Sequence, residues 1–176
     1  MKHLLLTAII ALLPALAVAD GQQVSLRLEV RQQSSVENKG PQNATKTQHR
    51  QLEISVSNIS RDPVEKVQVN WWFFSRNMKS GDESVLKKGV SKPFAVPALG
   101  KTTVSSDKVT STYEERHTET VKSKGKGKGK PKTTVKNVPA SGNKISGYAV
   151  KVVHDGEVVS EYYSAPSYKQ RLAQAK

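Results

Sequence analysis

Seven lysines lie within fifteen residues of this chain, and their type and spacing point most directly to a chemistry. They are Lys122, Lys124, Lys126, Lys128, Lys130, Lys132 and Lys136, and no acidic residue lies between the first and the last. Ammonium groups at this density attract phosphates and sulfates. Each contact with a polyanion releases a counterion, so affinity falls steeply with salt. We therefore expect the loop 122–136 to contact anionic polymers.

The composition of this loop narrows the partner. Lysine alternates with glycine from Lys124 to Lys130, which predicts a flexible lysine-rich arm, because glycine leaves the backbone unrestrained and the charges repel one another. Arginine and aromatic residues are absent from the loop, so sequence-specific recognition of nucleic acid is not expected. An anionic glycolipid or an acidic polysaccharide is the expected partner. The same composition is also typical of a loop that only keeps a protein soluble.

Residues with the spacing of a catalytic or metal centre do not stand out. His117 and Glu119 share one face of a predicted strand, but a zinc site needs at least three protein ligands, so we interpret the pair as a salt bridge. No serine lies in a Gly-x-Ser-x-Gly context, and the chain has no cysteine. We expect a protein that is not an enzyme and that binds no metal or cofactor.

The first nineteen residues have the pattern of a secretory signal peptide. Lys2 precedes the apolar run 4–13, and the small residues of Ala17-Val18-Ala19 predict cleavage before Asp20. The run is shorter than the ~20 apolar residues that a membrane span needs. We therefore expect a secreted or periplasmic protein without a transmembrane segment.

The mature chain, residues 20–176, is long enough for a single domain. It carries 27 basic and 15 acidic residues, a net charge of +12, which favours polyanionic neighbours. Without cysteine it must fold through hydrophobic burial alone. Two tripeptides, at Asn43 and Asn58, match the acceptor of N-glycosylation, which matters only in a eukaryotic host.

Period-two patterns predict strands along most of the mature chain. Apolar residues alternate with polar ones over 24–30 and again at Leu52, Ile54 and Val56. Between these strands the polar stretch Gln32 to Gln48, with Gly40-Pro41 near its middle, predicts a loop.

The stretch Val64 to Arg76 predicts a central strand. Val67, Val69, Trp71 and Phe73 share one face, and Trp72 and Phe74 put aromatic rings on the other. A strand that is apolar on both faces at one end is expected to be covered there by another element. An exposed aromatic platform for a ligand is the alternative.

The last third carries the clearest turn. Apolar runs at 145–153 and 158–163 flank Asp155-Gly156, the preferred two-residue turn of a β-hairpin. Residues 167–175 can form one or two helical turns, and the flanks 118–122 and 132–138 can pair as a ribbon that carries the lysine loop.

About seven short strands without a long helix predict an all-β protein with a single antiparallel two-sheet sandwich. The order of the elements resembles the immunoglobulin-like and fibronectin type III-like class: Trp71 and Trp72 lie in the third strand, and Tyr148 lies in the penultimate one. The resemblance implies a small secreted bacterial protein in which the sandwich is a scaffold. We expect a binding or interaction module of the cell envelope that uses its basic loop. The alternative is a passive structural or assembly component that pairs with a protein partner through its strand edges.

Overall fold

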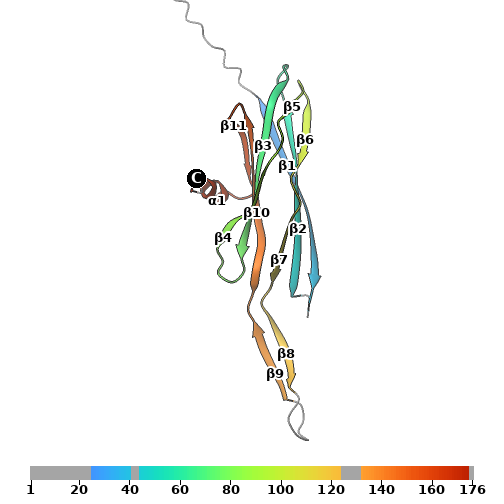
Figure 1. Cartoon of the computed structure of the whole chain (residues 1–176), viewed down its shortest axis with the longest axis vertical. Coiled ribbons are helices and arrows are strands. Elements are labelled where there is room, and N and C mark those ends of the chain that lie inside the picture. The colour runs from blue at the N-terminus through green and yellow to red at the C-terminus, as the bar shows by residue number, and fades with distance from the viewer. Residues whose placement is uncertain (1–24, 41–43, 124–131, 175–176) are drawn as a thin grey trace, which may run out of the picture.

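The computed structural model describes residues 25–40, 44–123 and 132–174, and these are mostly antiparallel β-strand (Figure 1). In chain order the elements are β1 (Leu26–Lys39), β2 (Thr45–Asn58), β3 (Val64–Asn77), β4 (Glu83–Val90), β5 (Phe94–Val96), β6 (Lys101–Ser105), β7 (Val109–Glu114), β8 (His117–Ser123), β9 (Lys132–Val138), β10 (Ser141–His154), β11 (Glu157–Tyr163) and α1 (Ser167–Gln174). The all-β prediction is confirmed. The described residues hold eleven strands where about seven were expected. The predicted signal peptide, its cleavage before Asp20 and the lysines from Lys124 to Lys130 lie outside the described residues.

The main strands form two layers that share β10. In one layer β2 pairs with β1 along its whole length, with β7 through its first half and with β6 through its second. In the other layer β10 lies between β3 and β11, and β3 also pairs with β4 and β5. The first residues of β10, Ser141 and Gly142, pair with the end of β7 and so join the layers. The arrangement is sandwich-like.

The core lies between these layers, and it follows from the predicted alternation. Leu52, Ile54 and Val56 of β2 are fully buried, and they form one cluster with the inward residues of the facing strands. From β3 and β10 these are Val67, Val69, Trp71, Phe73, Val150 and Val152. Burial of such side chains contributes roughly 1.5–3 kcal/mol each, which lets a chain without disulfides fold.

The second face of β3 is covered by α1, as the pattern of aromatic residues predicted. The Phe74 ring stacks on Tyr168 with centroids 4.2 Å apart. Gly147 permits this contact, because a Cβ there would lie 2.3 Å from the Tyr168 ring. Trp72 is only half-buried, so the predicted cover is complete over Phe74 and partial over Trp72.

The predicted loop from Gln32 to Gln48 is wrong. β1 continues to Lys39 and β2 begins at Thr45, and fourteen residue pairs match the two strands from Leu26↔Asn58 to Lys39↔Thr45. The outer half of β1 is exposed on both faces, so it has no apolar alternation to detect. Backbone hydrogen bonds in the ladder hold these polar residues in strands.

Three local predictions are confirmed. Asp155 and Gly156 both have positive φ, 47° and 85°, and His154 pairs with Glu157 across the two-residue turn. Such a turn matches the right-handed twist of the strands it joins. The helix over 167–174 is present, and the flanks of the lysine loop pair as β8 and β9.

Candidate polyanion-binding surface

Strands β8 and β9 form a two-stranded ribbon, which we call the basic ribbon (residues 117–138). It continues the β7–β10 pair past the end of the two layers and projects from the body (Figure 1). Within the described part of the chain, β8 and β9 pair only with each other. The basic ribbon contains seven lysines and one glutamate, a net charge of +6 with His117 neutral. These 22 residues therefore carry half of the charge expected for the mature chain.

The pairing register of β8 with β9 determines which face of the basic ribbon each strand lysine occupies. Lys122 pairs with Thr133, Lys132 with Ser123, and Lys136 with Glu119. Because neighbouring residues of a strand alternate between faces, positions 132 and 136 share a face with position 119, and position 122 is on the other. The structure thus does not gather these three lysines on one face. Charge on both faces suits a flexible or extended polymer better than one small anion.

Side chains of the basic ribbon add little packing. Val121 is 47% exposed and Val135 is 65% exposed, and beyond His117 at the base no residue described in the ribbon is buried. The ladder and the turn at its base therefore hold it in place. Lys136, whose side chain is exposed, is accessible there to a large partner.

His117 sits at the junction between the body and the basic ribbon. Its side chain is only 8% exposed; Nδ1 donates to the Glu115 carbonyl at 3.0 Å, while Nε2 lies 3.4 Å from Glu119 Oε1 and 3.8 Å from Glu114 Oε1. The Glu115 carbonyl, with help from the two carboxylates, raises the pKa of His117. The predicted salt bridge between His117 and Glu119 is present. Both residues belong to β8, whereas the longer approach of His117 to Glu114 links β8 to β7 of the body, and each ion pair requires a protonated His117.

Two further contacts fix the base of the basic ribbon. Lys46 of β2 donates to Glu115 Oε2 at 2.7 Å, and this hydrogen bond raises the pKa of Lys46 and lowers that of Glu115. Gly142 has a φ of 78°, and a Cβ there would lie 2.6 Å from the Thr112 carbonyl oxygen. The chain therefore leaves the body through a constrained turn.

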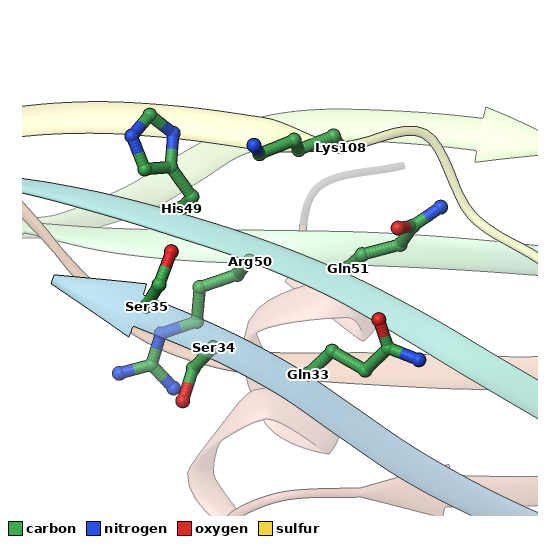
Figure 2. A pocket seen from close by; sticks show the side chains of 7 residues that line it. All are labelled: Gln33, Ser34, Ser35, His49, Arg50, Gln51 and Lys108. Carbon is green, nitrogen blue, oxygen red and sulfur yellow. The ribbon is translucent and has the colours of Figure 1, made fainter.

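A polar cleft of about 270 Å³ on the body is a second place where cations gather (Figure 2). It is lined by Gln33, Ser34, Ser35, His49, Arg50, Gln51 and Lys108. His49 and Lys108 lie on one side of β2, whereas Arg50 extends from the other. His49 also already contacts Thr110 Oγ1 at 2.9 Å and lies 3.4 Å from Glu37. The cleft therefore offers no set of donors that converge on one anion. Sequence reasoning missed it, because Gln33, Ser34 and Ser35 were predicted in a loop and their pairing with β2 was not foreseen.

The remaining candidate sites are a metal centre, two glycosylation acceptors and a membrane-spanning helix. No group of three or more His, Cys, Asp or Glu side chains there is arranged to hold a metal ion. Asn58 is 2% exposed, donates to the Asp62 carbonyl at 2.8 Å and accepts from Ser60, so the folded protein does not present it for glycosylation. Asn43 lies outside the described residues. No helix described in the structure is long and apolar enough to cross a membrane.

Comparisons with known proteins give no family for this chain. No family model matches it, and no curated protein matches it. One solved structure that it resembles is the "X-ray structure of Northeast Structural Genomics Consortium target SoR45". The two share 12% sequence identity over 81% of this chain and 88% of the other, with a TM-score of 0.36. At this TM-score the likeness bears on neither fold family nor function.

Proposed function

We propose that this protein is a secreted or periplasmic, non-enzymatic binding module that contacts anionic polymers of the cell envelope through its basic ribbon. The observation that carries the proposal is the separation of the ribbon from the body. Lys122, Lys132 and Lys136 lie on two strands that pair with no other described strand, and the other four lysines of the loop fall in the sequence between these strands. A segment that the core does not need, and that holds so much charge, is suited to binding.

An immunoglobulin-like sandwich is the proposed scaffold. In that fold the strands A, B and E are neighbours in one sheet, and C, F and G are neighbours in the other. If β1, β2 and β7 are taken as A, B and E, and β3, β10 and β11 as C, F and G, the observed pairings support the same neighbours. Loops and projections of such sandwiches carry the function, which agrees with the position of the basic ribbon.

Acidic polysaccharide or the phosphates of a glycolipid are the proposed partners. Lysine is a compact point charge, and it binds dispersed phosphate or sulfate groups without the planar geometry that arginine imposes. Both faces of the ribbon carry lysine positions, so a polymer can contact either one. Affinity then depends on the number of ion contacts and falls as salt rises.

The test replaces the six lysines from Lys122 to Lys132 by serine and compares the variant with wild type on immobilised heparin and on glycolipid vesicles at rising salt. A matched control removes six exposed lysines of the body instead. Those are Lys66, Lys79, Lys88, Lys92, Lys101 and Lys108. We expect the ribbon variant to lose salt-sensitive retention and the control to keep most of it. Equal retention of both variants would refute the proposal.

A further inference from the structure

A partly apolar groove lies between the edge strand β4 and the helix α1, on the opposite layer from the polar cleft. It has a volume of about 450 Å³ and is lined by Trp72, Val85, Leu86, Lys87, Lys88 and Leu172. A second hollow of about 180 Å³ shares Val85 with it. We call the larger hollow the β4 groove.

The walls of the β4 groove are fixed in place. Arg171 of α1 pairs with Glu83 of β4 at 3.2 Å and also donates to the Glu83 carbonyl at the same distance. On the sheet side, Tyr168 stacks on Phe74. The helix is thus tied both to β4 and to β3, and the groove is formed before any partner arrives. A preformed site avoids part of the entropic cost of binding.

One wall of the groove belongs to a strand with a free edge. β4 pairs with β3 from Asn70↔Val90 to Arg76↔Glu83, and no other described strand pairs with β4. Val85 is 42% exposed and Val90 is 60% exposed. An unpaired strand edge beside an apolar hollow is the arrangement that binds an extended peptide, since the backbone completes a ladder and alternate side chains enter the hollow.

Charge selects the kind of peptide. Lys87 already pairs with Asp107 at 3.0 Å, but Lys88, directly opposite Trp72 in the register, is exposed at the rim. The whole chain carries a formal charge of +13, so a second copy would meet like charge, whereas an acidic segment would meet the opposite charge.

We propose that the β4 groove binds an extended acidic segment of another protein. The segment adds as a strand to the free edge of β4, places an apolar side chain between Trp72 and Leu172, and sets a carboxylate beside Lys88. This surface is distinct from the basic ribbon.

The probe is a synthetic peptide of about ten residues in which glutamate alternates with leucine and valine, together with a counterpart in which lysine replaces glutamate. Because the basic ribbon would also attract glutamate, both peptides are titrated into the variant with six ribbon lysines replaced by serine. Of the two tryptophans, Trp71 is buried and Trp72 lines the groove, so tryptophan emission reports occupancy. Trp72→Phe should abolish the signal.

We expect the acidic peptide to shift the emission with saturation and the basic peptide to leave it unchanged. Val85→Lys and Lys88→Glu should each weaken binding by about tenfold or more. Val158→Lys is the matched control, because Val158 is a 49% exposed valine on another edge strand, and it should bind as before.

Three results would overturn the proposal. One is no saturable shift with the acidic peptide at millimolar concentration. Another is equal binding by the Val85→Lys and Val158→Lys variants. The third is a peptide-free dimer in sedimentation that Val85→Lys dissociates, which would make a second copy the occupant. None of these depends on whether the ribbon binds polyanions.

Discussion

The body and the basic ribbon are built on the same antiparallel ladder, but they differ in what the ladder supports. In the body, strands such as β2 and β3 turn apolar side chains into the core, where Leu52, Ile54 and Phe73 are fully shielded from solvent. In the ribbon, β8 and β9 pair in regular register while Val121 and Val135 remain exposed. The body is therefore stabilised by hydrophobic burial, and the ribbon by backbone pairing and its anchored base. The buried residues that stabilise the fold and the densest cluster of basic residues therefore belong to different parts of this molecule.

The largest expected effect is in the body. Phe73→Ala removes a fully buried ring from the cluster between the layers, and it should lower the free energy of unfolding by about 3–5 kcal/mol. Urea denaturation followed by circular dichroism measures the change. A loss below ~1 kcal/mol would mean that the layers are packed too loosely to form a core.

A polar contact inside the body should give the next largest effect. Gln48 is 3% exposed, and its Oε1 accepts a hydrogen bond from the Ile145 backbone N–H at 2.9 Å, which links β2 to β10. Gln48→Leu leaves that buried N–H without its partner and should cost about 1–3 kcal/mol. Gln33→Leu, at an exposed position of β1, is the control and should change stability little. Similar losses of unfolding free energy in the two variants would contradict the role of Gln48 as a link between the layers.

A smaller, pH-dependent effect is expected where the body meets the ribbon. The pKa of His117 is raised in the folded protein, mainly by the Glu115 carbonyl, so protonated His117 stabilises the fold. This stabilisation is fully present below the unfolded value of about 6.5 and is lost as pH rises through the folded value. Wild type should therefore exceed His117→Gln in thermal midpoint at pH 5, and the difference should shrink by pH 8.5. A difference that grows with pH would contradict the assigned contacts.

The smallest expected effect is in the ribbon itself. Val135→Ala removes apolar atoms that are already in contact with solvent, so the free energy of unfolding should change by less than about 0.5 kcal/mol. Val150→Ala is the matched control, because Val150 is fully buried, and it should be clearly destabilising in the same urea titration. If both substitutions cost the same, the ribbon packs against something and the contrast with the body fails.

The sequence predicted the parts of the fold that depend on local patterns. Alternation identified the buried face of β2, and Asp155-Gly156 identified the last hairpin, since only a few residues accept positive φ at both turn positions. It could not predict the outer halves of β1 and β2, where Ser34 pairs with Arg50 and Glu37 with Thr47, because polar residues on both faces leave no periodic signal.

Other features depend on contacts between distant residues. The division between β6 and β7 falls at Ser106, whose Oγ accepts a hydrogen bond from the Leu52 backbone N–H at 2.9 Å, a contact with a residue 54 positions away. The β4 groove needs α1 to pack beside β4, although Val90 at the end of β4 and Ser167 at the start of α1 are 77 positions apart in the chain. No local sequence pattern reports such a contact. Trp72 is the one residue of the groove to which the sequence drew attention, because the alternative to a covered face was an exposed aromatic platform for a ligand.

The most direct test of the central claim is to excise the basic ribbon. His117 and Val138 are paired in the register, so residues 118–137 can be replaced by Asn-Gly, which closes a two-residue hairpin between them. Urea unfolding and salt elution from heparin are then measured on the same preparation. We predict that the free energy of unfolding stays within about 1 kcal/mol of wild type, while salt-resistant retention on heparin disappears. Loss of cooperative unfolding, or elution at the wild-type salt concentration, would contradict the separation of a stable body from a binding ribbon.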